Sequence, residues 1–214
     1  MVRSTAVTLA PEMTAAALAE LCRLVRTRAW PGGHLEIGTA AGGTLCELMA
    51  ATPHQPPFVV VDPMTYFPDQ RRIVERNLAG HGLALERVSI REMRSQDAYQ
   101  QARQRGERFD FMLVDGAHKF RHVLADLRWA NLLTVGGVLT LHDYDLNTPG
   151  VIHAADDFLA RNRNYCRQGL TDSLLIIEKT GADAPGGVRL MPMLTAWGWG
   201  VYWQWRTSWR KRFK

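Results

Sequence analysis

The chain has 214 residues, of which 46% are hydrophobic and 22% charged, a composition that suits a soluble globular protein with one α/β domain and a substantial core. No apolar run approaches the ~20 residues needed to cross a bilayer, and no charged-then-apolar signal pattern opens the sequence, so we expect a cytoplasmic protein. The net charge of +5 belongs to the C-terminal end, because six basic residues and no acid follow Asp183 while the rest of the chain sums to −1. A body of that charge argues against a nucleic-acid-binding domain.

The three cysteines, Cys22, Cys46 and Cys166, lie far apart and form no CxxC pair. Scattered cysteines in odd number are typical neither of a disulfide framework nor of a zinc site. We therefore interpret them as buried free thiols in a reducing cytosol.

The first half of the chain alternates helical and extended patterns. Residues 12–28 place apolar side chains on one face and predict a helix, which ends before the turn at 30–33. A short strand at 34–37 leads into a glycine-rich loop at 38–44 and a second helix, and an apolar strand at 58–61 ends at Asp62. The patterns then predict a helix at 70–79, a strand at 87–91 and a polar surface helix at 95–105.

The second half repeats this alternation. An apolar run at 111–114 stops at Asp115, a helical pattern follows over 123–132, and a Gly136-Gly137 turn starts an apolar run at 138–141 that stops at His142-Asp143. A helix at 151–161 precedes two runs, 165–170 and 174–178, whose spacing predicts a hairpin and hence an antiparallel strand at one edge.

Alternating β and α units predict an α/β fold with a doubly wound, seven-stranded, mostly parallel sheet and one antiparallel edge strand. We place this domain at residues 1–180. A Gly-rich linker and a basic aromatic tail follow over 181–214.

The glycine-rich loop lies between a strand and a helix, where glycines let a ligand approach the backbone closely. Its spacing is not GxGxxG, because Ala40 takes the place of the second glycine, and it is not a phosphate-binding P-loop. Asp62, at the end of the next strand, is placed to accept hydrogen bonds from a ribose diol. A plain tight turn is the alternative for the loop taken alone.

Polar side chains gather at the ends of two neighbouring parallel strands. Asp115 and His118 follow one strand, and His142 and Asp143 follow the other. Ligands bind at this edge of such sheets, so these four residues are candidates for metal or proton chemistry. Alternatively, Asp115 caps the following helix, Asp143 starts a turn and His142 packs away. His118 and His122, four residues apart, could also form a zinc pair.

The sequence Leu35-Glu36-Ile37-Gly38-Thr39-Ala40-Ala41-Gly42-Gly43, with Asp62 and the Asp115 strand following in order, resembles the class I S-adenosylmethionine-dependent methyltransferases over about residues 12–180. This resemblance implies the fold predicted above and S-adenosylmethionine as cofactor. It implies Glu36 near the methionine end or the loop's own backbone, and Asp62 on the ribose hydroxyls. It further implies a cofactor path along the loop residues Gly38, Thr39, Gly42 and Gly43, and adenine contacts at Ser95 and Gln96.

Asp115-Gly116-Ala117-His118 and His142-Asp143 resemble the small metal-dependent O-methyltransferases of the catechol, caffeoyl-coenzyme A and sugar or macrolide types. The resemblance implies Asp115, His142 and Asp143 as ligands of a divalent cation, with Mg²⁺ first and Mn²⁺ or another softer metal as alternatives. His118 stands where several relatives have a catalytic lysine, and we expect it to act as general base beside Asp115.

These expectations favour methyl transfer from S-adenosylmethionine to a hydroxyl of a small molecule or sugar. The rivals are a metal-independent methyltransferase with a nitrogen or carbon acceptor, and a non-catalytic S-adenosylmethionine-binding module tethered by its tail. In that tail, tryptophans and basic residues over 197–214 suit a lid, a subunit contact in a homo-oligomer, or a peripheral contact with the inner membrane face.

Overall fold

The computed structural model describes residues 10–28, 30, 32–53 and 56–192. Within these residues, seven strands form one sheet: β1 Gly33–Ile37, β2 Phe58–Asp62, β3 Val88–Glu92, β4 Phe109–Val114, β5 Leu133–Leu141, β6 Tyr165–Thr171 and β7 Leu174–Lys179. The helices of the same residues are α1 Ala15–Thr27, α2 Gly43–Ala51, α3 Gln70–Gly80, α4 Ser95–Gln104, α5 Phe120–Asp126 and α6 Pro149–Arg161, with short 3₁₀ turns η1 Leu85–Arg87 and η2 Leu127–Leu132.

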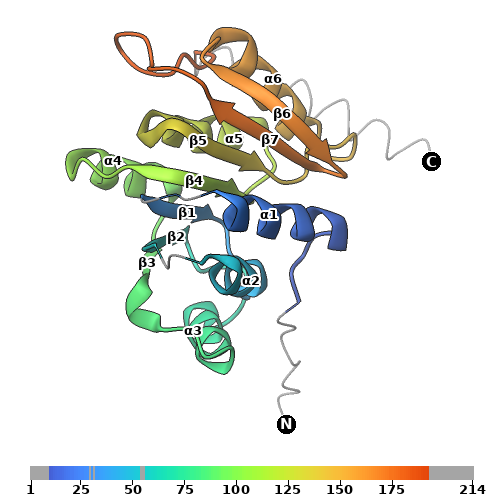
Figure 1. Cartoon of the computed structure of the whole chain (residues 1–214), viewed down its shortest axis with the longest axis vertical. Coiled ribbons are helices and arrows are strands. Elements are labelled where there is room, and N and C mark those ends of the chain that lie inside the picture. Colours follow the sequence, from blue (N-terminus) through green and yellow to red (C-terminus); the bar gives the residue numbers. More distant parts are fainter. Residues whose placement is uncertain (1–9, 29, 31, 54–55, 193–214) are drawn as a thin grey trace.

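The strands follow the order β3-β2-β1-β4-β5-β7-β6, from the bottom to the top of the sheet in Figure 1. The first five are parallel to one another, and β7 runs antiparallel to both β5 and β6. The predicted doubly wound, mostly parallel α/β fold is confirmed. The reversed strand is β7, which lies one place inside the edge because its hairpin partner β6 takes the outermost position.

Helices cover both faces of the sheet. Alternate residues of each strand point to opposite faces, so Phe58 and Val60 pack with α1, α2 and α3, whereas Val59 and Val61 pack with α4, α5 and α6. Because both faces are buried, β2 and β4 consist mostly of apolar residues, which is why they stand out in the sequence.

Two local differences from the sequence expectations have structural reasons. β5 begins at Leu133 rather than at the expected 138, because the Gly136-Gly137 pair lies inside an irregular stretch of the strand where its register to β4 shifts. All three cysteines are free, but Cys166 is exposed, so the expectation of a buried thiol is wrong there. It lies on the outermost strand β6, most of whose side chains face solvent.

The segment after β7 returns to the domain. The carboxylate of Asp183 accepts hydrogen bonds from Lys179 Nζ (2.6 Å) and the Tyr165 hydroxyl (2.9 Å), and the backbone N–H of Arg189 donates to Asn162 Oδ1 (2.7 Å). The tail at 197–214 lies outside the described residues. Among the residues that are described, no helix has the length and apolarity to cross a membrane.

Candidate active site

A cavity of about 820 Å³ opens at the carboxyl ends of the parallel strands, where the loops after β1, β2, β4 and β5 meet. It brings together every residue predicted for the site except Gly42. The predicted residues in its wall are Glu36, Gly38, Thr39, Gly43, Asp62, Ser95, Gln96, Asp115, His118, His142 and Asp143.

Gly38, directly after β1, packs against the backbone directly after β4 and leaves no room there for a side chain. Its φ of +83° is left-handed, and a Cβ at this position would lie 2.3 Å from the carbonyl oxygen of Asp115. The neighbouring backbone is tied across the strands, since the Asp115 N–H donates to the carbonyl of Ile37 (2.8 Å). Gly42, also left-handed at φ +85°, precedes α2 and faces Val74 behind the loop, so it shapes the loop rather than lining the cavity.

Asp62 fixes the glycine loop to the end of β2. One carboxylate oxygen accepts from the backbone N–H of Thr39 (3.0 Å), and the other accepts from the backbone N–H of Met64 (2.6 Å). Gln70 contributes a longer bond to Asp62 and donates to the carbonyl of Ala40 (2.9 Å). Backbone donors therefore hold this carboxylate in one orientation at the cavity wall.

Glu36 is a buried acid without a cation. It is 2% exposed, and its Oε2 atom has no hydrogen-bond partner. Burial, together with the nearby charges of Asp115 and Asp62, raises the pKa of Glu36 well above its usual value. A positively charged ligand in the cavity would stabilise the ionised form of this carboxyl group.

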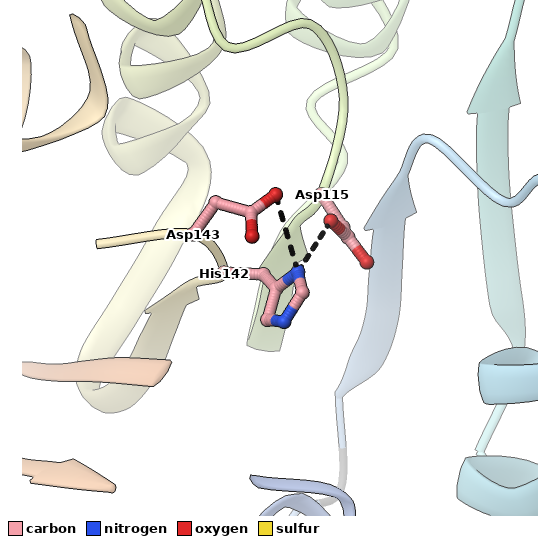
Figure 2. Close-up of side chains that lie close together, drawn as sticks. All are labelled: Asp115, His142 and Asp143. Atoms are coloured by element: carbon pink, nitrogen blue, oxygen red, sulfur yellow. Dashed lines mark hydrogen bonds and ion pairs between the residues drawn. The ribbon is translucent and has the colours of Figure 1, made fainter. Parts of the chain in front are cut away.

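Two acids and two histidines cluster at the ends of β4 and β5. The Nδ1 atom of His142 lies 3.0 Å from Asp115 Oδ1 and 3.5 Å from Asp143 Oδ2, and Figure 2 shows both carboxylates turned toward the imidazole. The Nε2 atom of His118 lies 2.7 Å from the same Asp143 oxygen. His142 thus points into the cluster, not away from it.

The carboxylates control the protonation of both histidines. Burial lowers the pKa of His142, but hydrogen bonds and charges from Asp115 and Asp143 outweigh it and raise this pKa to about 10. The hydrogen bond to Asp143 raises the pKa of His118 against the effect of burial, and the two imidazoles lower the pKa of Asp143. Protonated His142 therefore serves as the cation between two carboxylates, a place that a metal ion could take instead.

One ligand atom from each of Asp115, His142 and Asp143 lies within 4.8 Å of the others, so these three residues could hold a metal ion. In the described part of the chain, His118 and His122 are not in any such group, and the zinc-pair alternative gains no support. Asp115 does not cap α5 either, because the residue before that helix is Lys119. Asp143 adopts a left-handed φ of +58°, which costs energy in a residue other than glycine.

The sequence interpretation missed part of the cavity wall. Asp126, at the end of α5, is 5% exposed and lines the cavity, as do Arg94, Arg121 and His122. The signal for Asp126 was available, because it stands three residues after Val123 and so interrupts an otherwise apolar helix face. Ser95 proved to be held in place, since its hydroxyl accepts a hydrogen bond from Trp129 Nε1 (2.9 Å).

A family model described as a methyltransferase domain matches residues 35–144, just over half of the chain. The chain belongs to this methyltransferase family. The resemblance to class I S-adenosylmethionine-dependent methyltransferases that the glycine loop and Asp62 predicted is therefore confirmed. The matched residues run from within β1 to just past β5 and include the whole acid–histidine cluster.

Solved methyltransferase structures share the fold at low identity. An O-methyltransferase from Bacillus cereus in complex with SAH aligns with a TM-score of 0.66 and 19% identity over 79% of this chain and 83% of that one. The O-methyltransferase TomG from Streptomyces achromogenes, in complex with SAM, aligns with a TM-score of 0.63 and 21% identity over 79% of this chain and 82% of that one. CalS11, a TDP-rhamnose 3'-O-methyltransferase, aligns with a TM-score of 0.60 and 16% identity over 76% of each chain. No curated protein matches this methyltransferase.

Proposed function

We propose that this methyltransferase moves the methyl group of S-adenosylmethionine to a hydroxyl of a small molecule or sugar, with a divalent cation held by Asp115, His142 and Asp143. The observation that carries the proposal is the meeting of two carboxylates and an imidazole in the cavity that the glycine loop lines. The names of the B. cereus enzyme and of CalS11 support an oxygen acceptor.

The residues at the β1 and β2 ends fit S-adenosylmethionine. The carboxyl of Glu36 faces the cavity with an unpartnered oxygen and would neutralise a cationic group of the cofactor. Asp62 would accept the ribose hydroxyls, and Ser95 and Gln96 would contact the base, while Gly38 lines the cavity wall. When bound, S-adenosylmethionine supplies an activated methyl group, so the protein mainly provides orientation and proton transfer.

The β4 and β5 ends fit a divalent cation. Two carboxylates suit Mg²⁺, while the imidazole of His142 also suits Mn²⁺ or another softer ion. Such an ion, when bound, makes a hydroxyl group easier to deprotonate. Loading requires His142 to give up the proton that the two carboxylates favour, so binding releases a proton.

His118 is the chain's own candidate for accepting the hydroxyl proton. Its imidazole is about half exposed to the cavity mouth, with a side-chain exposure of 48%, and Asp143 holds it through Nε2. It is not one of the three ligand residues. We assign it the role of general base, with Asp143 orienting the ring.

Asp115→Ala and Asp143→Ala test this assignment. Each variant should lose Mn²⁺ binding by at least about 100-fold in an electron paramagnetic resonance titration, because one of three ligands is gone. Release of S-adenosylhomocysteine in assays with catechol and sugar acceptors should stop, while calorimetric affinity for S-adenosylhomocysteine stays within about threefold. Asp97→Ala, which removes an exposed acid of α4 outside the cavity wall, is the matched control.

Full activity of Asp115→Ala in the presence of a chelator would refute the metal assignment. A second candidate would then apply, because the 2.7 Å contact between His118 and Asp143 is also a metal-free general-base pair. In that case turnover should resist chelator and survive in Asp115→Ala but fall sharply in His118→Ala, with nitrogen and carbon acceptors tested alongside hydroxyls.

A further inference from the structure

Asp126 is a buried acid that the proposed reaction does not use. Its carboxyl group lines the cavity at 5% exposure, and none of the ion pairs among the described residues involves it. Burial raises the pKa of Asp126 to about 7, and a hydrogen bond with Ser95 opposes this shift. A buried acid without a cation needs hydrogen-bond donors, since an ionised carboxylate only accepts.

The surroundings of Asp126 supply one donor and leave room for another. Ser95 Oγ accepts from Trp129 Nε1 at 2.9 Å, so the hydroxyl proton of Ser95 is free to point at Asp126. On another side the carboxyl lies against the turn after β4, where a Cβ on Gly116 would be 3.5 Å from Asp126 Oδ2. The remaining acceptor capacity of Asp126 faces the cavity.

The sheet order places Asp126 at the nucleoside end of the cavity. Its partner Ser95 begins α4, which follows β3, and β3 pairs with β2, the strand that ends at Asp62. The metal-ligand candidates come instead from the ends of β4 and β5. Asp126 therefore lies between the turn after β4 and Ser95, and its contact with Ser95 places it beside the residues expected to bind the base.

Three buried acids of the described chain line the cavity, namely Glu36, Asp62 and Asp126. S-adenosylmethionine offers three kinds of hydrogen-bond donor, which are its ammonium group, its ribose hydroxyls and the exocyclic amino group of adenine. The proposal above pairs the first two with Glu36 and Asp62. The amino group of adenine is the donor that remains for the third acid.

We propose that Asp126 accepts a hydrogen bond from the exocyclic amino group of the cofactor's adenine and so selects for this base. The proposal rests on S-adenosylmethionine being the cofactor. Trp129 acts as a positioning residue, because it holds the hydroxyl of Ser95, which in turn faces the carboxyl of Asp126. A ligand without the amino group would leave the buried carboxylate short of a donor, which is the arrangement that rejects an analogue most strongly.

Calorimetry with two ligands tests the proposal: S-adenosylhomocysteine and its 6-desamino analogue, in which hydrogen replaces the amino group. At pH 8.5, where the Asp126 carboxyl is ionised, the wild type should bind S-adenosylhomocysteine about 10- to 100-fold more tightly than the analogue. Asp126→Ala should lower the affinity for S-adenosylhomocysteine by that factor and change the affinity for the analogue by no more than about threefold. The ratio of the two affinities should therefore fall close to one. Asp126→Asn, which keeps the shape, should give an intermediate ratio, and Asp97→Ala should keep the wild-type ratio.

The outcomes separate the two proposals. Equal binding of both ligands by the wild type, or an unchanged ratio in Asp126→Ala and Asp126→Asn, would overturn the role of Asp126 while leaving the cofactor assignment intact. Failure of the wild type to bind S-adenosylhomocysteine at all would overturn the cofactor assignment, and the role of Asp126 with it. If Asp126→Ala does not fold, the ratio in Asp126→Asn, which keeps the shape of the side chain, decides the question.

Discussion

Similar residues have different roles at the amino ends and at the carboxyl ends of the parallel strands. Strand β4 shows this contrast most simply. At its amino end, the buried carboxylate of Asp110 accepts hydrogen bonds from the Gly32 N–H and from Thr134 Oγ1 (2.6 Å), so its oxygens are engaged by the protein. Asp115, just past its carboxyl end, lines the cavity with a side-chain exposure of 20% and one close partner, His142. Asp110 lies outside the cavity wall and stabilises the fold, whereas Asp115 opens on the cavity, where it can bind a ligand.

Strand β1 repeats the contrast with a different pair. His34, near its amino end, is enclosed by the rings of Trp30, Phe58 and Phe111 at centroid distances of 5.0 to 5.6 Å. Glu36, two residues later on the same face, looks into the cavity with an unpartnered oxygen. Burial disfavours the charged form of both groups, but only Glu36 lies where a cationic ligand could stabilise its charge.

The largest expected effect comes from adding a side chain at Gly38, where the backbone after β1 contacts the backbone after β4 beside the cavity. Gly38→Ala should lower the free energy of unfolding by about 3 kcal/mol or more, because a backbone carbonyl oxygen stands 2.3 Å from the new Cβ. Its affinity for S-adenosylhomocysteine should fall at least about 100-fold as the loop shifts. Urea denaturation and calorimetry measure the two effects.

Gly82→Ala is the control for backbone conformation, since Gly82 has a left-handed φ of +68° but nothing within 4 Å of the added Cβ. It should cost only about 1–2 kcal/mol and leave ligand affinity unchanged. Equal losses in the two variants would mean that the φ angle, and not the contact with Asp115, makes Gly38 necessary.

A second prediction compares the two acids of β4. Asp110→Ala should lower the free energy of unfolding by about 2–3 kcal/mol, because it leaves the Gly32 N–H and the Thr134 hydroxyl without their acceptor, while S-adenosylhomocysteine affinity stays within about twofold. Asp115→Ala should cost less stability, since water in the cavity can replace the lost partner, but it should lose Mn²⁺ binding. A larger stability loss for Asp115→Ala than for Asp110→Ala would remove the distinction between the edges.

The smallest effects are opposite dependences on pH from the two ionisable groups of β1. Burial lowers the pKa of His34 to about 4, so between pH 6.5 and 4 the unfolded chain holds a proton on His34 that the folded chain does not. Stability from this group is complete above pH 6.5 and is lost as the pH falls, by about 2 kcal/mol between pH 7.5 and pH 5. Urea denaturation should show this part of the acid loss disappearing in His34→Phe.

Glu36 has the reverse sign. Because the folded state raises the pKa of its carboxyl, its contribution is greatest at low pH and is lost as the pH rises above the usual value of 4.5. Glu36→Gln should therefore be more stable than the wild type at pH 8 and not at pH 4.5. A gain of the same size at both pH values would show that ionisation of Glu36 is not the cause.

The fold was largely predictable because its signals are local. Buried parallel strands appear as short apolar runs, helices as a 3.6-residue repeat, and the polar residue after each run marks the strand end, as Asp62 and Asp115 do. The parallel topology then places these ends at one edge, which is why most of the predicted site residues meet in one cavity.

Details that depend on distant partners were not predictable in this way. The exposure of Cys166 depends on which strand ends up outermost, and the early start of β5 depends on a register shift against β4. Asp126 could be noticed as a polar interruption in an apolar helix face, but its place in the cavity wall becomes visible only when α4 and α5 pack together.

By itself, the sequence determined the order of the elements, the strand ends that form the site and the resemblance to the methyltransferase family, since each depends on residues that are near one another in the chain. Only the tertiary structure decided that His142 turns between Asp115 and Asp143, that Glu36 keeps an unpartnered oxygen, and that Asp110 is engaged by the protein while Asp115 is open. The physical reason is that a side chain's orientation, charge state and access to a ligand depend on atoms brought to it from other strands and helices, which no local pattern specifies.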